Sequence, residues 1–225
     1  MEILYFAAIA AGAYFFGGLN GAILTSRLVY GQDIREHGSG NAGLTNFYRT
    51  YGGQAMFLVL LIDVIKTALP VVVGGMILET SSTFGSVEDR IIIGRTFAGL
   101  FAMIGHAYPC LHGFKGGKGI LSGGTVALFL DIRVFFILFV IFAIVVLITR
   151  YVSLGSVIMG VAFPVAYLVL GMPLSATLLA ALCGIFVIYR HRENIGRLIA
   201  GEERKLSFGK KREQEEHEAQ EEEEA

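Results

Sequence analysis

Apolar segments long enough to cross a lipid bilayer recur along this chain, and they constrain its fold more than any other feature. A membrane-spanning helix needs roughly 17–25 predominantly apolar residues. Only 16% of the 225 residues are charged, whereas a soluble domain carries about a quarter. We therefore predict an all-α fold, a polytopic integral membrane helical bundle. The seven predicted spans are residues 3–26, 54–78, 89–109, 119–131, 133–149, 155–171 and 173–190.

The fourth predicted span is the least regular of the seven. Only Asp131-Ile132-Arg133 separates it from the fifth, and Gly123-Gly124 interrupts its apolar run. Irregular helices are tolerated at membrane depth where their backbone is buried in protein or lines a cavity. We therefore expect residues 119–131 to form a short or broken helix.

Basic residues are distributed unevenly between the two sides of these spans. Fourteen Lys and Arg residues fall on one side, and only Arg90 and Arg133 fall on the other. Because loops rich in Lys and Arg stay in the cytoplasm, we predict an outside N-terminus and a cytoplasmic C-terminus. The fourteen are Arg27, Arg35, Arg49, Lys115, Lys118, Arg150, Arg190, Arg192, Arg197, Arg204, Lys205, Lys210, Lys211 and Arg212.

The C-terminal segment has a different composition from the rest. Residues 213–225 hold eight of the nineteen acidic residues and no Lys or Arg. The rest of the chain therefore contains all eighteen Lys and Arg residues but only eleven acidic residues. Dense blocks of like charge are usually disordered. We expect a single transmembrane domain over residues 1–205 and a charged, disordered cytoplasmic tail over 206–225.

A glycine-rich loop follows the first predicted span. Its segment Gly38-Ser39-Gly40-Asn41-Ala42-Gly43 matches G-x-G-x-x-G, but the dinucleotide fingerprint requires a preceding strand and a βαβ unit. Here the loop joins two membrane helices, so we reject a nucleotide site. The loop still combines hydroxyl, amide and guanidinium donors. Thr45 and Asn46 are residue types that favour a helix N-cap, where free N–H groups attract anions. An anion site and an ordinary cytoplasmic turn both remain open for this loop alone.

A second loop places two lysines among four glycines, in Gly113-Phe114-Lys115-Gly116-Gly117-Lys118-Gly119. The P-loop pattern G-x-x-x-x-G-K-[ST] cannot be aligned on it. Glycine allows a close backbone approach, and lysine supplies positive charge. The loop therefore favours phosphate binding, with a flexible cytoplasmic loop that follows the positive-inside rule as the alternative. His106, which precedes it, is interpreted as a structural hydrogen-bonding residue.

One charged pair lies inside a predicted span. Asp63 and Lys66 are one helical turn apart, and ionisable groups within membranes usually pair in the bundle interior. We interpret them as a structural ion pair, with a substrate role as the alternative.

Several chemistries lack their sequence signature. The chain contains no H-x-x-x-x-D or G-x-S-x-G motif and no evident nucleophile paired with a base. It also has no cluster of acidic residues suited to a metal-dependent phosphotransferase, and Cys110 and Cys183 show no zinc-site spacing. We expect no metal, no cofactor and no nucleic-acid partner.

Four short motifs occur in order along the chain. They are Ile34-Arg35-Glu36-His37-Gly38-Ser39-Gly40-Asn41 with Gly43, Thr45-Asn46 and Arg49; Gly105-His106 with Pro109 and residues 113–119; Tyr151-Val152-Ser153-Leu154; and His191-Arg192-Glu193-Asn194-Ile195 with Arg197-Leu198, Gly201 and Lys205. Together they resemble the acyl-phosphate:glycerol-3-phosphate acyltransferases of bacterial membranes, the PlsY type. The family usually has proline at Ala42 and alanine at Leu44, departures that remove no charge.

The resemblance implies transfer of a fatty acyl group from acyl phosphate to the 1-hydroxyl of sn-glycerol 3-phosphate, which yields lysophosphatidic acid for phospholipid synthesis. It implies a multi-pass protein of the bacterial cytoplasmic membrane, in contact with membrane lipid and with its active site on the cytoplasmic face. It also implies a functional link to the enzyme that makes acyl phosphate. A transporter of organic phosphate and an acyltransferase with another donor or acceptor remain the alternatives.

Both substrates carry phosphate, so two anion sites are expected. The predicted catalytic residues are Ser39, Arg49, Lys118, Ser153, Ser156, His191, Glu193 and Asn194. The predicted phosphate-binding residues are Ser39, Gly40, Asn41, Thr45, Asn46, Arg49, Lys115, Gly116, Gly117, Lys118 and Asn194. We expect the glycerol hydroxyl to attack directly, with proximity and charge stabilisation as the main catalytic effects.

Overall fold

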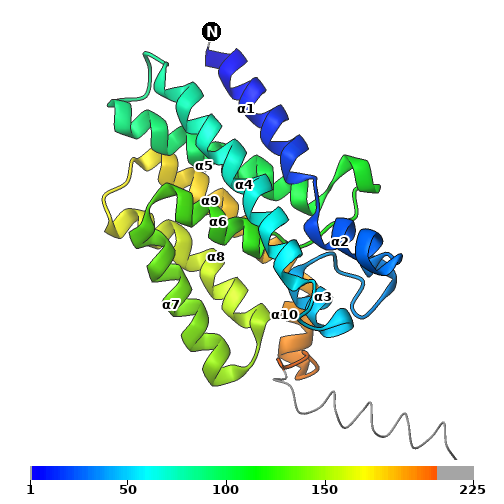
Figure 1. Cartoon of the computed structure of the whole chain (residues 1–225). Helices are drawn as coiled ribbons and strands as arrows, with labels where there is room; N and C mark the ends of the chain where they lie inside the picture. The colour runs from blue at the N-terminus through cyan, green and yellow to red at the C-terminus, as the bar shows by residue number, and fades with distance from the viewer. Residues whose placement is uncertain (1, 207–225) are drawn as a thin grey trace, which may run out of the picture.

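The computed structural model describes residues 2–206, and within that range every regular element is a helix (Figure 1). The predicted acidic tail, apart from Leu206, lies outside the described residues. The α-helices are α1 Glu2–Gly17, α2 Gly21–Tyr30, α3 Leu44–Tyr51, α4 Met56–Glu79, α5 Val87–Ala107, α6 Ile120–Leu130, α7 Ile132–Thr149, α8 Val152–Val169, α9 Leu174–Arg190 and α10 Arg192–Ala200; the 3-10 helices are η1 Ile34–Glu36 and η2 Cys110–His112.

Every predicted apolar segment contains a helix, but the helices differ in their capacity to cross a membrane. Five helical segments are long and apolar enough, and a sixth is added if α9 and α10, bent by 55°, count as one span. The five are Glu2–Tyr30, Met56–Glu79, Val87–His112, Ile132–Thr149 and Val152–Val169. Helix α6 has eleven residues, about 16 Å of rise, so it is short as expected but cannot cross alone. Seven crossings and the orientation of the termini remain predictions.

The first predicted span is not one continuous helix. Helix α1 ends at Gly17 and α2 begins at Gly21, so the predicted span over residues 3–26 is interrupted at residues 18–20, although Glu2–Tyr30 together is long and apolar enough to cross a membrane. Between them, the Asn20 side chain accepts a hydrogen bond from the Ile23 amide at 3.0 Å and donates one to the Ala42 carbonyl at 3.0 Å. An asparagine at this position starts a new helix and ties it to the first glycine-rich loop.

Helix α5 lies at the centre of the bundle and packs against α1, α4, α6 and α9. Glycines allow the closest of these approaches. A Cβ on Gly74 of α4 would lie 2.7 Å from the Ala98 Cβ and 2.8 Å from the Gly94 carbonyl oxygen of α5. Small residues at helix contacts let backbones approach, which increases packing between membrane helices. The close contact between α4 and α5 therefore requires a residue without a side chain at Gly74.

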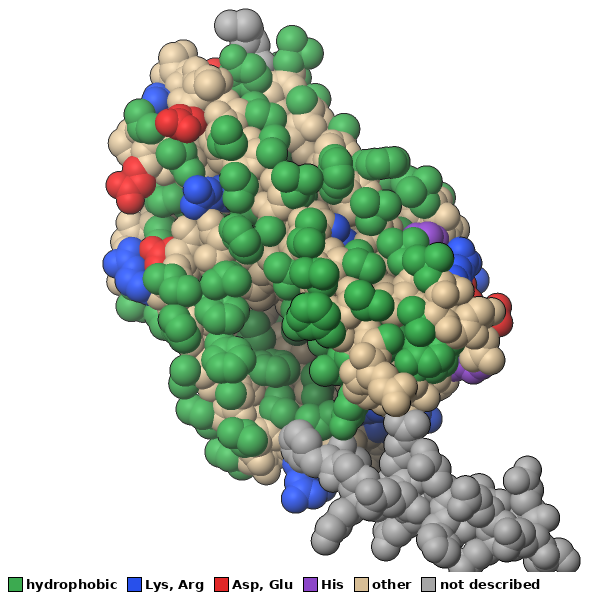
Figure 2. All heavy atoms as spheres, viewed as in Figure 1, with side chains coloured by type: hydrophobic (Ala, Val, Ile, Leu, Met, Phe, Trp, Pro, Cys, Tyr) green, Lys and Arg blue, Asp and Glu red, His purple; other side chains and the backbone are tan. Residues whose placement is uncertain are grey.

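The outer surface of the bundle is apolar. Figure 2 shows hydrophobic side chains over most of the visible face, with charged groups mainly along its edges. On α7, for example, Phe136, Phe139, Leu147 and Ile148 are exposed. A soluble protein exposes only scattered apolar residues, whereas this surface exposes many, and such a surface suits contact with lipid. The surface agrees with a membrane-embedded bundle.

A second, smaller unit lies beside the bundle. Helices α2, α3 and α10 lie away from the N-terminal end of α1 (Figure 1). We call α2, η1, α3, α10 and the loop of residues 108–119 the polar end. A separate apolar cluster supports it, formed by Ala22, Ile23, Ile34, Ala42, Phe47, Ala55 and Val59. The glycine-rich loops are thus mounted on a small core of their own.

Candidate active site

A cavity of about 620 Å³ lies where the polar end meets the bundle. Figure 2 shows the visible face hollowed between the α7–α8 pair and the α3–α4 segment. Its polar lining comes mainly from the two glycine-rich loops, α3 and α10, and its apolar lining comes from α3, α6, α7 and α8. The apolar part of the lining consists of Leu44, Ile120, Leu121, Phe142 and Val152.

Four helices begin at this cavity. The first residues of α3, α6, α8 and α10 are Leu44, Ile120, Val152 and Arg192, and all four line it. The first N–H groups of a helix have no partner within the helix, and the helix dipole places positive partial charge there. Helix N-termini therefore bind anions. These four N-termini contribute positive partial charge from the backbone, against the negative partial charge of the α9 C-terminus at Arg190, which also lines the cavity.

Basic side chains add formal charge to the same cavity. Six of them line it: Arg49, Lys118, Arg190, Arg192, Arg197 and Arg204. Three acidic residues, Asp63, Glu193 and Glu203, also line it. Glu203 accepts a hydrogen bond from Arg197 Nε at 2.8 Å, and Asp63 pairs with Lys66 at 2.8 Å. The unbalanced charge of the cavity is therefore positive.

Lys118 joins a chain of hydrogen bonds that links the second loop to α10. Its Nζ donates to Asn194 Oδ1, and Asn194 Nδ2 donates to Glu203 Oε1 at 2.6 Å. Burial lowers the pKa of Lys118 to about 8, and the neighbouring Arg197 acts in the same direction. A bound anion would reverse this effect because it favours the charged ammonium.

The first loop is shaped by a buried amide. Asn46 Oδ1 accepts from the Ser39 amide at 2.9 Å, and Asn46 Nδ2 donates to the His37 carbonyl at 3.0 Å. Neither Thr45 nor Asn46 is an N-cap, because α3 begins at Leu44 and is capped by Gly43 without a side-chain bond. That expectation is wrong. Asn46 instead holds the loop that presents Ser39 to the cavity.

The second loop differs from its expected form in two respects. The Gly116 and Gly117 amides donate to the Ala107 and His106 carbonyls, both at 3.1 Å, so they are already used within the fold. The Lys115 side chain is exposed, and neither Lys115 nor Gly117 lines the cavity. The loop therefore presents Lys118 but does not form a phosphate cradle from these two amides.

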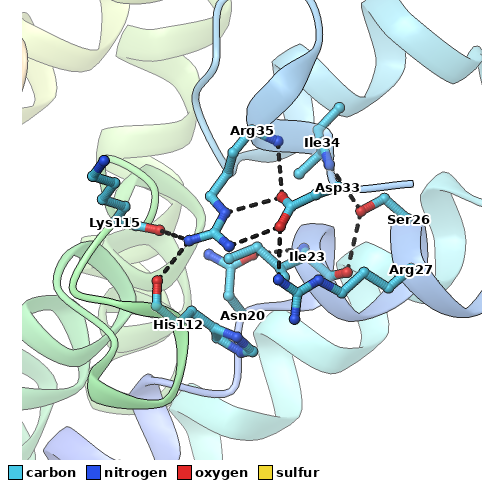
Figure 3. A network of polar contacts seen from close by, with 9 residues as sticks. All are labelled: Asn20, Ile23, Ser26, Arg27, Asp33, Ile34, Arg35, His112 and Lys115. Carbon is cyan, nitrogen blue, oxygen red and sulfur yellow. Dashed lines mark hydrogen bonds and ion pairs between the residues drawn. The ribbon is translucent and has the colours of Figure 1, made fainter. Parts of the chain in front are cut away.

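Arg35 of η1, just before the first loop, forms hydrogen bonds with the second loop (Figure 3). Arg35 Nη1 donates to the His112 carbonyl at 2.6 Å and to the Lys115 carbonyl at 3.2 Å. The same guanidinium donates two further hydrogen bonds to the Asp33 carboxylate, of 2.9 and 2.7 Å. These bonds to Arg35 hold the pKa of the Asp33 carboxyl well below its usual range. A bidentate pair fixes the guanidinium plane, so Arg35 sets the relative position of the loops.

Three buried residues form a polar network beside the loops. Lys66 Nζ lies 2.8 Å from Asp63 Oδ1 and 2.8 Å from His106 Nδ1. Asp63 Oδ1 also accepts from the Gly21 amide at 3.0 Å. The expected ion pair of Asp63 and Lys66 is therefore present, and it includes a histidine that sequence reasoning treated separately. Both Asp63 and His106 line the cavity.

The remaining predicted residues lie on α8 and at the start of α10. Ser153 and Ser156 are buried and line the cavity, and Ser156 Oγ donates to the Val152 carbonyl at 2.8 Å. His191 Nδ1 bonds to the Val187 carbonyl at 2.8 Å. A carbonyl only accepts, so Nδ1 carries the proton and His191 Nε2 is left as an acceptor.

Most of the predicted site residues converge on one cavity. Those that line it are Ser39, Gly40, Asn41, Thr45, Asn46, Arg49, Gly116, Lys118, Ser153, Ser156, His191, Glu193 and Asn194. The lining residues absent from the predicted set include Arg190, Arg192, Arg197, Glu203 and Arg204. Arg192 and Arg197 belong to the fourth motif, although no role was assigned to them. For Arg190, Glu203 and Arg204 the sequence signal is the density of charge after the last apolar run, which is equally typical of a lipid-facing basic cluster.

Fold and cavity together define a class: a multi-pass helical membrane protein with one mixed polar and apolar cavity suited to anionic substrates. Residues 7–201 match the family model described as glycerol-3-phosphate acyltransferase. The chain belongs to this family.

Relatives and solved structures agree with this assignment. A glycerol-3-phosphate acyltransferase of Finegoldia magna is 41% identical over 208 residues, covering 92% of this chain and 98% of the relative. Glycerol-3-phosphate acyltransferase 2 of Bacillus cereus is 39% identical over 203 residues, covering 88% and 94%. The crystal structure of PlsY, an integral membrane glycerol 3-phosphate acyltransferase, in its glycerol 3-phosphate form gives a TM-score of 0.78 at 32% identity, over 90% of this chain and 96% of that one.

Proposed function

We propose that this protein transfers a fatty acyl group from acyl phosphate to the 1-hydroxyl of sn-glycerol 3-phosphate and releases lysophosphatidic acid and inorganic phosphate. One observation carries the proposal: four helix N-termini and six basic side chains converge on a cavity that also has an apolar lining. Two phosphates need more positive charge than one helix terminus supplies, and the acyl chain needs apolar contact. A single cavity offers both.

The basic residues divide between two phosphate positions. Arg49 and Ser39 come from the first loop and α3, whereas Lys118 comes from the second loop. Lys118 and Asn194 are already hydrogen bonded to each other. We assign Lys118 and Asn194 to one substrate phosphate, and Ser39 and Arg49 to the other. Arg190, Arg197 and Arg204 supply surrounding charge.

The apolar lining gives the acyl group a route into the site. Ile120, Leu121, Phe142 and Val152 line the same cavity as Lys118, and they belong to α6, α7 and α8, which are bundle helices. An acyl phosphate in the membrane can keep its chain among these helices while its phosphate reaches the basic residues. Ser153 and Ser156 lie at the boundary between the two environments.

The reaction needs little activation of the donor because acyl phosphate carries a good leaving group. The glycerol 1-oxygen bonds to the carbonyl carbon, and the carbonyl electron pair moves to its oxygen. The pair returns as the carbon–oxygen bond to phosphate breaks, and phosphate leaves with that bonding pair. A substrate phosphate oxygen takes the hydroxyl proton. Positioning and electrostatic stabilisation supply the rate enhancement, and Glu193 and His191 orient neighbouring groups.

We place this chemistry at the cytoplasmic face of the bacterial cytoplasmic membrane, with the N-terminus outside. Fourteen Lys and Arg residues against two support that orientation. Glycerol 3-phosphate is water-soluble and would enter from the cytoplasm. The donor must come from an enzyme that makes acyl phosphate.

The test uses the purified full-length protein in detergent, with labelled glycerol 3-phosphate. Palmitoyl phosphate and palmitoyl-CoA are offered in parallel reactions. We expect lysophosphatidic acid from palmitoyl phosphate alone. A Lys118→Met variant, run beside it, measures any uncatalysed acylation. Product from palmitoyl-CoA alone would mean that acyl-CoA, and not acyl phosphate, is the donor. An acyl-enzyme trapped on serine would exclude direct attack by the glycerol hydroxyl.

A transporter of organic phosphate is the competing function. It would be supported if folded protein gave no lysophosphatidic acid from either donor yet moved labelled glycerol 3-phosphate into liposomes. Transporters usually bind substrate near the bilayer midplane. Apart from Asp63, which lies inside α4, the polar cavity residues belong to loops, to the short helices α3 and α10, or to the ends of longer helices, which favours the enzyme.

A further inference from the structure

We infer that His106 is a catalytic residue: its Nε2–H group donates a hydrogen bond to the acyl carbonyl oxygen as negative charge develops there. The inference deepens the proposed acyl transfer and rests on it. The observation behind it is a buried histidine whose one ring nitrogen is occupied by Lys66 while the residue lines the reaction cavity.

The partners of His106 determine which nitrogen carries its proton. Lys66 Nζ lies 2.8 Å from His106 Nδ1 and 2.8 Å from Asp63 Oδ1. The adjacent carboxylate favours the charged ammonium, and an ammonium group has only donors. His106 Nδ1 must therefore accept, so the proton of the neutral ring lies on Nε2.

The Nε2 atom of His106 lies beside Gly117 of the second loop. No hydrogen bond among residues 2–206 uses His106 Nε2, although only 3% of the residue is exposed. A Cβ on Gly117 would overlap Nε2 and would lie 2.6 Å from the Ala42 carbonyl oxygen. Glycine at position 117 thus leaves room in front of the donor, where a methyl group would cover it.

A neutral donor suits a carbonyl better than a phosphate, which is bound more strongly by cationic donors. Asp63 Oδ1 lies 3.9 Å from His106 Nδ1 but is paired with Lys66 at 2.8 Å, so the pair brings no net charge to the ring. The cationic groups that suit phosphate, Lys118 and Arg49, lie on other elements of the cavity. A carbonyl oxygen is uncharged in the ground state and gains charge only during attack. Donors preorganised for that charge lower the barrier.

The His106 contribution leaves the atom balance of the reaction unchanged. The glycerol oxygen adds to the carbonyl carbon, and the carbonyl electron pair moves onto the oxygen that faces Nε2–H. The imidazole keeps its proton throughout, and the hydroxyl proton still goes to a phosphate oxygen. Asp63 and Lys66 act through His106 by fixing its tautomer, so they are positioning residues.

Two substitutions distinguish the role of His106 Nδ1 from that of His106 Nε2. His106→Asn keeps an acceptor near the Nδ1 position for Lys66 but removes the donor at Nε2. His106→Gln can place an amide N–H near the Nε2 position. Both are assayed as full-length purified protein with palmitoyl phosphate and glycerol 3-phosphate, and thermal unfolding checks that each is folded.

We expect His106→Asn to lower kcat by about 10²- to 10³-fold, the effect of losing one oxyanion donor, while both KM values change less than about threefold. We expect His106→Gln to retain at least tenfold more activity than His106→Asn. A folded His106→Asn variant with nearly normal kcat would overturn the inference. So would a loss confined to the KM for glycerol 3-phosphate, or equal losses in both variants.

A second measurement uses the unsubstituted protein and covers the case in which neither variant folds. With ¹⁵N-labelled histidine, NMR should show His106 as the Nε2–H tautomer, and its Nε2 signal should shift when palmitoyl phosphonate, a non-transferable donor mimic, is added. An unchanged signal with the phosphonate bound, or an Nδ1–H tautomer, would refute the role. If the unsubstituted enzyme makes no lysophosphatidic acid, the proposed function itself fails, which is a different outcome.

Discussion

The bundle and the polar end use different means to hold their helices. In the bundle, α4 and α5 meet at Gly74 and Gly94, where any added carbon atom would collide with backbone. In the polar end, loops are held by side-chain bonds to backbone, such as those from Arg35 and Asn46. Side-chain size therefore limits substitution in the bundle, whereas hydrogen-bonding geometry limits it in the polar end. Substitutions of each kind should therefore fail in distinguishable ways.

Removal of the cavity lysine should produce the largest effect and leave the bundle intact. Lys118→Met deletes the ammonium that bonds Asn194 and is assigned to a substrate phosphate. We expect kcat/KM for acyl transfer to fall by about 10³-fold, as for loss of a charged group that stabilises the transition state. The thermal unfolding midpoint should change little.

Lys115→Met is the matched control, since Lys115 belongs to the same loop but is exposed and does not line the cavity. It should retain activity within about twofold, as expected for a surface substitution. Equal losses in both variants would mean that the loop acts through its overall charge.

Arg35 tests whether hydrogen bonds to backbone position the polar end. Arg35→Ala removes its bonds to the His112 and Lys115 carbonyls, and misplacement of the second loop should lower kcat/KM by about 10- to 100-fold. Arg35→Lys cannot reproduce the bidentate contact with Asp33, so it should recover little of that loss.

Arg27→Ala provides the comparison for that experiment. Arg27 also pairs with Asp33, but its side chain is 50% exposed, against 20% for Arg35. Exposed ion pairs contribute little, so activity should stay within about twofold. If Arg27→Ala matched Arg35→Ala, the charge of Asp33 rather than the loop contact would explain both.

Gly94→Ala tests the size limit in the bundle. The added methyl would overlap the Gly74 carbonyl oxygen and lie 2.9 Å from the Leu78 Cβ. Overpacking of this kind costs about 1–3 kcal/mol, so the thermal unfolding midpoint should drop by several degrees. Gly12→Ala is the control, because nothing lies within 4 Å of a Cβ there. It should be neutral or slightly stabilising, and equal destabilisation by both would remove the packing explanation.

The smallest effect is a dependence on pH that is confined to the polar end. Burial lowers the pKa of Lys118 to about 8, so the free enzyme should lose kcat/KM about tenfold per pH unit above that value, as the ammonium is deprotonated. Lys118→Arg keeps its charge and should abolish this decline. A decline that persists in Lys118→Arg would assign it to another group.

The same pKa has a consequence for stability. Between about pH 8 and the ordinary lysine value, the unfolded chain binds more protons at position 118 than the folded protein does. Stability contributed by this residue should therefore rise with pH across that window and be lost as pH falls through about 8.

The bundle was easier to predict from sequence than the polar end, for a physical reason. Long apolar runs place helices α4 to α9 within a few residues because lipid requires every backbone group to be bonded internally. The break at Asn20 escaped because Gly18 and Leu19 continue the apolar run, and only the contact from Asn20 to Ala42 shows why the helix must restart there.

The site was predictable where charge and glycine are adjacent in sequence, and not where the fold assembles it. Lys118 and Asn194 were found from their motifs, whereas the bond between them and its continuation from Asn194 to Glu203 and Arg197 depend on how α10 and the residues after it fold. The composition of the second loop also could not reveal that the Gly116 and Gly117 amides turn toward carbonyls of their own chain.

Four helix N-termini at one cavity have a consequence for how the protein can be inhibited or inactivated. Positive potential from peptide groups does not titrate and cannot be deleted one residue at a time. A scan that neutralises each cavity arginine singly should therefore reduce phosphate affinity in steps but leave a residual affinity that none of the variants removes. An inhibitor that carries a fixed anionic group could rely on that residual attraction even in variants selected for the loss of a basic side chain.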